Sequence, residues 1–329
     1  EAAVVIGTHA VIEDNVEFKN LVLAITDEQH RFGVRQRARL GKKGQSPHVL
    51  IMSATPIPRT LALILYGDLD ISVVDELPPG RQNVDTFVVD LSMRRRIDKF
   101  IEKNVIAGRQ VYVVCPLVEQ SQSLDLKAAT QVKQRLEEIF PSFSVALLHG
   151  KMKPKEKNEI MEKFSLGETN ILVSTTVIEV GVNVPNATVM IIENAERFGL
   201  SQLHQLRGRV GRGARRSYCI FVSDAIKKSG AARERLNTVK CSHDGYYIAE
   251  KDLAMRGPGD FIAARTEERL RQSGGVRFRL AELCEDVGLM TLAFDEARAL
   301  LASDATLESY PLLKREVGRA FYSDSTLIN

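Results

Sequence analysis

Short, uninterrupted apolar runs alternate with amphipathic helical patterns along most of the chain, up to about residue 224. Such runs are typical of strands buried on both faces of a parallel sheet. The segments between these runs have helical spacing. One example is the apolar stripe formed by Ile97, Phe100, Ile101 and Val105. The alternation therefore predicts an α/β fold with parallel sheets. The predicted strands cover residues 21–25, 49–52, 110–115, 144–148, 170–174, 187–192 and 217–222.

The length of 329 residues suggests about two domains and an appendage, at roughly 150 residues per domain. The segment Glu76-Leu77-Pro78-Pro79-Gly80-Arg81 interrupts both patterns, so we expect an inter-domain linker at about 76–92. Strand patterns stop near residue 224, and helices joined by Gly-rich turns follow. The predicted domains are 1–80, 81–223 and 224–329.

Composition excludes several classes of protein. Hydrophobic residues at 44% and charged residues at 26% are ordinary for a soluble globular protein. No apolar run approaches the roughly 18 residues of a membrane span, and no secretory leader is visible. The cysteines lie far apart without a CxxC pair, so neither a zinc site nor a disulfide framework is indicated. The chain lacks an initiator Met, which suggests a piece of a longer protein. Arginines cluster at 31–39, 94–96, 207–216 and 256–279, which hints at an anionic partner.

Polar residues follow two of the predicted strands, where ligands bind in open α/β sheets. Asp27 and Glu28 come after the first run, within the segment 26–30, and the segment 53–56 follows the second. One acid could hold Mg²⁺ through water, and the other could activate a water molecule. A solvated turn is the other interpretation of the acid pair alone.

The run Gln205-Leu206-Arg207-Gly208-Arg209-Val210-Gly211-Arg212 is the most specific signal in the sequence. Glycine costs roughly 1 kcal/mol in a helix interior, whereas it permits close backbone approach. Guanidinium groups match phosphate oxygens. A basic surface loop is the alternative, and the glycine spacing does not fit a GxGxxG dinucleotide motif. The segment 175–185, after another strand, combines hydroxyls with a glycine; it suits phosphate contacts or the cap of a short helix.

These segments together resemble a superfamily 2 DNA helicase. The tail resembles the translocation segment shared by the RecG and Mfd families, and the whole set looks most like the RecG family. The motifs that carry the resemblance are, in order, GTHAVI (7–12), DEQHRFGV (27–34), SATPIPRT (53–60), LLHGKM (147–152), STTVIEVGVNVPNA (174–187), QLHQLRGRVGRG (202–213), DGYYIAEKDLAMRGPGDF (244–261) and RQSG (271–274).

The resemblance implies two RecA-like parallel-sheet lobes, the first N-terminally incomplete, and a mainly helical C-terminal translocation segment. It implies an ATP-dependent DNA helicase, with ATP and Mg²⁺ as cofactors. Its partner would be branched double-stranded DNA, on which it would reverse stalled forks and migrate Holliday junctions during repair and recombination. We expect a monomer in the bacterial cytoplasm, associated with the nucleoid and not with a membrane.

Motif positions also imply roles for individual residues. Asp27 would hold Mg²⁺ and Glu28 would activate water, while Gln205, Arg209 and Arg212 would face ATP, the two arginines as fingers. Gly181 and Asn183 would border the nucleotide. The residues implied to couple hydrolysis to movement are Gln29, His30, Ser53, Thr55, Arg256 and Gln272. The residues implied to contact DNA are Thr8, His149, Gly150, Thr175 and Thr176.

The sequence departs from the family pattern in two places. No G-x-x-x-x-G-K-[ST] phosphate loop occurs in the 329 residues, and the family carries this loop upstream of GTHAVI. Since its lysine and amides anchor the phosphates, we expect this chain alone to hydrolyse ATP negligibly. The spacing across 261–270 is longer than the family pattern, which leaves the tail geometry open.

Two alternatives remain at this point. The chain could be the equivalent part of an Mfd-like transcription-repair translocase, or a non-catalytic DNA-binding module without a phosphate loop. Sequence upstream of Glu1 would separate these readings. The intact acids and arginines argue against the non-catalytic module, because a scaffold has no chemical need for both.

Overall fold

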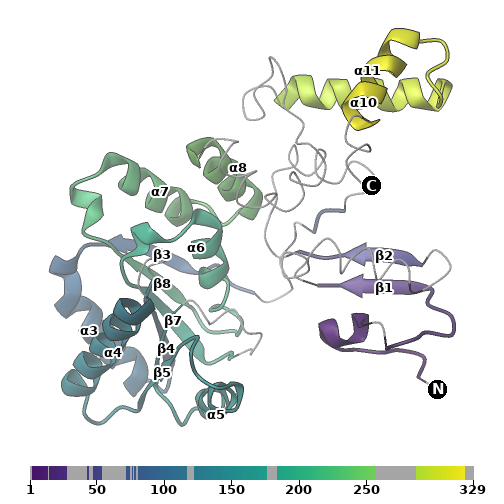
Figure 1. The fold of residues 1–329 in the computed structure, drawn as a ribbon. Helices are drawn as coiled ribbons and strands as arrows, with labels where there is room; N and C mark the ends of the chain where they lie inside the picture. Colours follow the sequence, from purple (N-terminus) through teal and green to yellow (C-terminus); the bar gives the residue numbers. More distant parts are fainter. Residues whose placement is uncertain are drawn as a thin grey trace. The chain divides into compact units, whose positions relative to one another are not determined.

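The computed structural model divides into two compact units (Figure 1). One unit consists of Glu1–Asp70 and Leu253–Asn329, and the other of Ile71–Asp252. The domain boundaries expected from sequence, 1–80, 81–223 and 224–329, stay a prediction. The structure describes residues 2–13, 15–27, 43, 47–53, 72–74, 76, 78, 81–116, 122–175, 184–256 and 287–322.

A six-stranded sheet, parallel throughout, forms the centre of the second unit. Every strand predicted from 110 onward is present, within a residue or two, which confirms the parallel α/β fold. In sheet order, the strands are β3 (Asp85–Val89), β8 (Tyr218–Val222), β7 (Ala187–Ile192), β4 (Gln110–Val114), β6 (Ile171–Ser174) and β5 (Val145–Leu148).

Strand β3 lies where the sequence predicted a linker, so that part of the expectation is wrong. The strand pairs with β8, with Asp85 opposite Tyr218 and Val89 opposite Val222. Its residues are only half-buried and Phe87 is exposed, because β3 is an edge strand. A half-buried strand directly after a Pro-Pro-Gly run shows no continuous apolar pattern that would reveal it.

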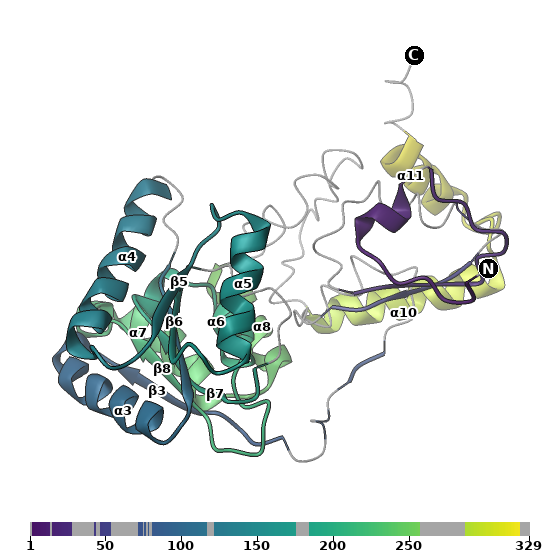
Figure 2. The same cartoon turned by 90° about the horizontal axis from the view of Figure 1, so that it is seen from below.

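Helices cover both faces of this sheet. Figure 2 shows α3 and α4 on one side, and α5 and α6 on the other. Because side chains alternate along a strand, Val111 and Val113 of β4 enter the core under α3 and α4, while Tyr112 contacts Phe164 of α5 on the opposite face. These helices are α3 (Arg94–Ile106), α4 (Gln122–Ile139), α5 (Pro154–Ser165) and α6 (Leu200–Arg207).

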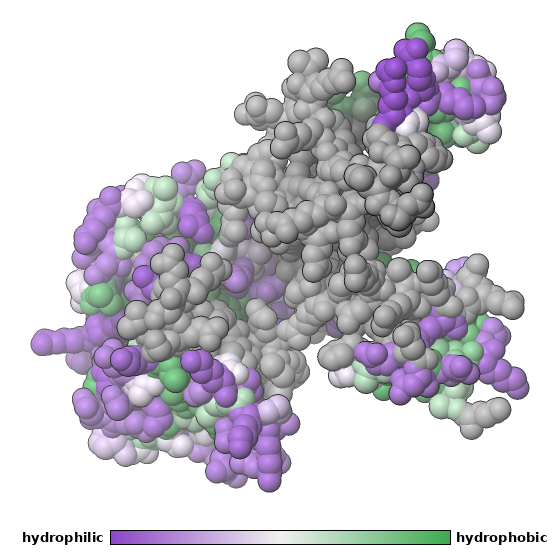
Figure 3. Space-filling model, in the orientation of Figure 1, coloured by the Kyte–Doolittle hydropathy of each residue, from purple (hydrophilic) through white to green (hydrophobic). Residues whose placement is uncertain are grey.

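Two further helices continue from the last strand, and α7 packs against both α6 and β3. They are α7 (Gly230–Cys241) and α8 (Gly245–Arg256). Single-turn 3-10 helices connect the elements of this unit: η3 (Leu91–Met93), η5 (Ala195–Arg197) and η6 (Ala225–Lys227). Figure 3 shows mainly hydrophilic side chains on the visible face of this unit.

The first unit contains a pair of parallel strands, β1 (Leu23–Thr26) and β2 (His48–Ile51), in register from Leu23 opposite His48 to Thr26 opposite Ile51. Both predicted strands of this region are therefore present. Its other described elements are η1 (His9–Ile12), α10 (Val287–Ser303) and α11 (Pro311–Tyr322). The described part of the tail is therefore mainly helical, as predicted. Across the described residues, every helix is too short or too polar to cross a membrane.

Candidate functional site

The arginine motif begins as helix α6 and leaves it in a tight turn. The helix ends at Gly208, whose N–H donates to the carbonyl of His204 at 3.0 Å. Gly211 has a positive φ of 76° and lies so close to Val84 that an added Cβ would come within 2.8 Å of its Cγ2. Glycine is required there for both conformation and space. The two glycines thus turn the chain away from the helix, with Arg209 between them.

The first arginine of the motif has a structural role. Arg207 is only 3% exposed; its Nη1 donates to the carbonyl of Val239 on α7 at 2.5 Å, and its Nη2 lies 2.9 Å from Nδ1 of His204. Burial lowers the pKa of Arg207. Burial, followed by the charge of Arg207, lowers the pKa of His204 to about 4. Arg207 therefore ties α6 to α7 instead of facing a ligand.

The other two arginines belong to a cationic group that includes Arg81. Arg212 Nε donates to the carbonyl of Gly208 at 3.2 Å, and Arg81 Nη2 donates to the same oxygen at 3.3 Å. Burial, then the charges of Arg209 and Arg81, lower the pKa of Arg212. Among the described residues, no carboxylate pairs with Arg81 or Arg212. We call Arg81, Arg209 and Arg212 the arginine cluster. Its positive charge suits a polyanion such as a nucleoside triphosphate.

Tyr112 lies close enough to the arginine cluster for the arginine charges to influence the pKa of its phenol. Burial raises the pKa of this tyrosine to about 12, while the charges of Arg209 and Arg212 oppose the shift. The phenol thus stays neutral below that pH and adds no charge to the cluster. Neither Tyr112 nor Arg81 was singled out from sequence; for Arg81 the only signal was its place directly after a Pro-Pro-Gly run.

The sheet of the second unit brings two predicted DNA-contacting residues together at its carboxyl edge. His149 follows β5 and Thr175 follows β6, and Thr175 N donates to the carbonyl of Leu148 at 3.2 Å. His149 Nδ1 and Thr175 Oγ1 are buried, and neither has a hydrogen-bond partner within the described part of the chain. Two buried polar atoms without partners at a sheet edge are expected where a ligand completes the hydrogen bonds.

Two lysines, Lys151 and Lys157, lie near this edge. Lys157 Nζ donates to the carbonyl of Gly150, the third predicted DNA contact here, at 2.7 Å. Burial lowers the pKa of His149, and the charges of Lys157 and Lys151 lower it further. A neutral imidazole beside ammonium groups can share a hydrogen bond with a phosphate oxygen while the lysines balance its charge.

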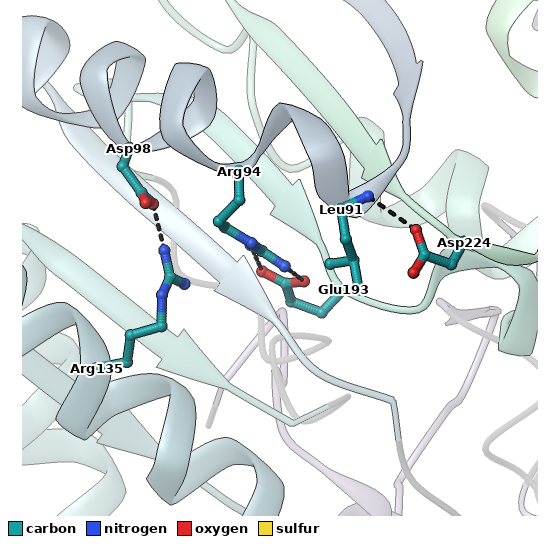
Figure 4. Close-up of polar contacts among 6 residues, drawn as sticks. All are labelled: Leu91, Arg94, Asp98, Arg135, Glu193 and Asp224. Atoms are coloured by element: carbon teal, nitrogen blue, oxygen red, sulfur yellow. Dashed lines mark hydrogen bonds and ion pairs between the residues drawn. The ribbon is translucent and has the colours of Figure 1, made fainter.

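Other charged residues of this unit serve its own structure (Figure 4). Arg94 of α3 makes two bonds to Glu193 after β7, at 2.5 Å and 2.6 Å, and Arg135 of α4 pairs with Asp98 of α3. Asp224 accepts from the N–H of Leu91 at 2.9 Å. In the run of arginines at 94–96, which hinted at an anionic partner, at least Arg94 therefore pairs within the fold.

In the first unit, two predicted site residues share the carboxyl edge of the β1–β2 pair. Asp27 follows Thr26, and Ser53 lies shortly after the end of β2; Met52 N donates to the carbonyl of Thr26 at 2.8 Å. Thr26 Oγ1 is buried without a partner among the described residues. Thr8 precedes η1 as an exposed N-cap residue. Asp27 and Ser53 thus lie at neighbouring strand ends, as expected from the strand order.

For the remaining predicted site residues, the structure gives at most a place in an element. Gln205 lies within α6, and Arg256 is the last residue of α8. The others lie outside the described residues: Glu28, Gln29, His30, Thr55, Thr176, Gly181, Asn183 and Gln272. Their roles stay predictions.

Comparison with known proteins finds similarity to helicases. Residues 93–214 match the family described as "Helicase conserved C-terminal domain". "ATP-dependent DNA helicase RecG" of Synechocystis sp. is 53% identical over 310 residues, which cover 94% of this chain and 36% of that protein. The protein of the same name from Bacillus subtilis is 49% identical over 320 residues, covering 96% of this chain and 46% of its own length. The chain thus spans less than half the length of these relatives.

Solved structures agree. "Structure of RecG bound to three-way DNA junction" matches with a TM-score of 0.66 and 45% identity, covering 87% of this chain and 35% of that one. The helicase Lhr of Mycobacterium smegmatis, bound to single-stranded DNA and AMP-PNP, matches with a TM-score of 0.50 and 17% identity over 66% of this chain. The second match concerns the fold alone.

Proposed function

Since this chain belongs to the RecG family, as a C-terminal portion of it, we propose that it is the motor part of an ATP-dependent translocase acting on branched double-stranded DNA. The proposed tasks are reversal of stalled forks and branch migration of Holliday junctions in repair and recombination. The proposed setting is the bacterial nucleoid, with the protein acting as a monomer. The relatives reported above carry RecG names, which supports this proposal over the Mfd-like alternative.

The arginine cluster is the observation that carries this proposal. Arg81 and Arg212 converge on one carbonyl, and no described carboxylate neutralises them. Bound triphosphate would supply the missing negative charge, so this donor set fits ATP. An arginine placed on a transferring phosphoryl group is worth about 10³–10⁵ in rate. We therefore assign Arg209 and Arg212 to stabilising charge on the transferring phosphate, with Gln205 beside them.

The acidic half of the site belongs to the first unit. Asp27 stands at a strand end beside the unpartnered hydroxyl of Thr26, and a single carboxylate is enough for an ion that keeps most of its water. Mg²⁺, when bound with ATP, neutralises phosphate charge. Asp27 would hold it and Glu28 would orient and deprotonate the attacking water.

We further propose that the edge formed by His149, Gly150 and Thr175 binds the DNA backbone. The lysines beside it would neutralise phosphates, while the two unpartnered polar atoms would form hydrogen bonds to them. Affinity from such contacts falls steeply with salt concentration. Thr8, Thr176 and the coupling residues keep the roles that their motifs imply.

The test uses a longer version of the protein that includes upstream sequence, with a three-way DNA junction and ATP. Arg209→Ala should abolish ATP turnover and leave junction affinity within about twofold, since an arginine finger acts on the phosphoryl group and not on DNA. Arg233→Ala is the matched control. Arg233 is an exposed arginine of α7 that also donates to a backbone carbonyl, that of Ile226, at 3.2 Å. Undiminished turnover by Arg209→Ala would refute the proposed role.

A second experiment addresses the phosphate loop. A fluorescent ATP analogue and Mg²⁺ are titrated into this chain and into the longer version. We expect much tighter binding by the longer version, because the loop supplies backbone amides and a lysine to the phosphates. Equal affinity in both would contradict the account of where the phosphates are anchored.

A further inference from the structure

Arg81 connects two distant parts of the second unit. It lies on the segment that leads into β3, yet its Nη2 donates to the carbonyl of Gly208 at the end of α6, at 3.3 Å. Arg212 Nε donates to the same oxygen at 3.2 Å. Two guanidinium groups therefore share one acceptor, although like charges repel.

The location of the shared acceptor explains why a cation is held there. The last carbonyls of a helix have no partner within the helix, and the C-terminal end of a helix favours positive charge. Gly208 caps α6, so its carbonyl points beyond the helix with unused acceptor capacity. Arg81 satisfies that capacity from outside the motif.

Residues 81–84, which lead into β3 and are called the incoming segment below, also pack against Gly211, the second glycine of the turn. A Cβ on Gly211 would lie 2.8 Å from Cγ2 of Val84 and 3.5 Å from the carbonyl oxygen of Gln82. Val84 is buried, so it forms a fixed surface for the turn. The incoming segment thus holds the turn at Gly208 through Arg81 and at Gly211 through Val84. Arg209 lies between these two fixed points in the chain.

We propose that Arg81 is a positioning residue for the arginine motif, holding the 208–211 turn so that Arg209 and Arg212 are presented in a fixed arrangement. This inference rests on the proposed function for its catalytic consequence.

The first test is structural and independent of catalysis. In the 329-residue chain, Arg81→Ala should shift the backbone amide NMR signals of residues 208–212, whereas Arg233→Ala should leave them in place. Arg81→Lys keeps a cationic donor and should restore part of the shift. Because Arg81 is exposed, its replacement should leave the rest of the amide spectrum unchanged. Signals of 208–212 that do not move in Arg81→Ala would overturn the proposal.

The second test measures ATP hydrolysis by the longer version with a three-way junction. Arg81→Ala should lower kcat about tenfold and raise KM for ATP by a clearly smaller factor, because misplaced arginines weaken transition-state contacts more than ground-state binding. Arg81→Lys should recover part of kcat, and Arg233→Ala should match the parent. An unchanged kcat, or an equal loss in the lysine and alanine variants, would refute the positioning role.

The two tests separate the two claims. If the parent protein hydrolyses no ATP with any branched DNA, the proposed function fails, and the NMR comparison still decides whether Arg81 holds the turn. If Arg209→Ala abolishes hydrolysis while Arg81→Ala leaves it intact, the proposed function stands and the role of Arg81 is refuted.

Discussion

Arg94 and Glu193 form a two-bond ion pair that fixes helix α3 to the end of strand β7 (Figure 4). The bonds join Nη1 to Oε1 at 2.5 Å and Nη2 to Oε2 at 2.6 Å, and the Glu193 side chain is only 9% exposed. Glu193 N also donates to the carbonyl of Val114 at 2.8 Å, so the backbone of Glu193 lies beside the neighbouring strand β4. The pair holds the first helix of the unit at the carboxyl edge of its sheet.

We expect Glu193→Gln to lower the free energy of unfolding by about 2 kcal/mol, because it leaves the half-buried Arg94 without its counter-charge. Urea unfolding followed by circular dichroism measures this loss. Glu137→Gln is the matched control, since Glu137 pairs with Lys133 one turn away on the exposed face of α4 and such pairs contribute about 0.5 kcal/mol or less. Equal losses in the two variants would show that burial does not strengthen the Arg94 pair.

Gly211→Ala should destabilise the second unit by about 1–3 kcal/mol. The alanine would have to keep the positive φ of Gly211, which is strained for a residue with a side chain, and its Cβ would overlap Val84 Cγ2. Gly230→Ala is the comparison, because nothing lies within 4 Å of its added Cβ at the start of α7. That variant should be neutral or slightly stabilising. Thermal unfolding of both variants measures the contrast, and a Gly211→Ala protein as stable as Gly230→Ala would contradict it.

The sequence predicted the strands well because most of them are central and fully buried, so their apolar runs are continuous. Val111, Val189 and Ile171, for example, are completely buried in adjacent strands. Strand β3 escaped prediction because edge position removes the need for apolar side chains on both faces. Its partner in the sheet, β8, lies more than a hundred residues later, and no local pattern reveals that pairing.

The site was predictable only where one motif carries it. The spacing of Gln205, Arg209 and Arg212 predicts a phosphate-directed group, yet the sequence could not show that Arg207 is buried, because that depends on α7. Arg81 stands 127 residues from Gly208 and meets it only through the sheet order. Contacts of this kind follow from tertiary structure and not from spacing.

Acid should destabilise the second unit through His204. Burial and the neighbouring Arg207 lower the pKa of His204 to about 4, well below the 6.5 of a free imidazole. A base with a depressed pKa favours folding at pH values above 6.5, and this contribution is lost as the pH falls toward 4, because the unfolded chain then binds the extra proton. Relative to His204→Gln, the parent should therefore lose up to about 3 kcal/mol of unfolding free energy between these values.

Urea unfolding of the parent and of His204→Gln, repeated across this pH range, measures the effect as a difference. The carboxylates and the other histidines titrate in both proteins, so their contributions cancel. Parallel stability curves for the two proteins would mean that the pKa of His204 is the same in the folded and unfolded states, which would contradict the prediction.

Thr175→Val should separate a DNA-binding hydroxyl from a structural one. Thr175 Oγ1 is buried and has no partner among the described residues, so replacing the hydroxyl by a methyl of similar shape should leave stability unchanged or raise it by about 1 kcal/mol. If a DNA phosphate accepts a hydrogen bond from this hydroxyl, the same change should lower affinity for a three-way junction about tenfold. Fluorescence anisotropy at one fixed salt concentration measures the affinity in the longer version.

Thr188→Val provides the control for this experiment. Thr188 Oγ1, in strand β7, is likewise buried and without a partner in the described part of the chain, but it lies at the amino end of its strand, away from the carboxyl edge. Its replacement should have the same small effect on stability and none on DNA affinity. Equal junction affinity for both variants and the parent would exclude the Thr175 hydroxyl from DNA binding. A large loss of stability in Thr175→Val alone would instead assign that hydroxyl to the fold.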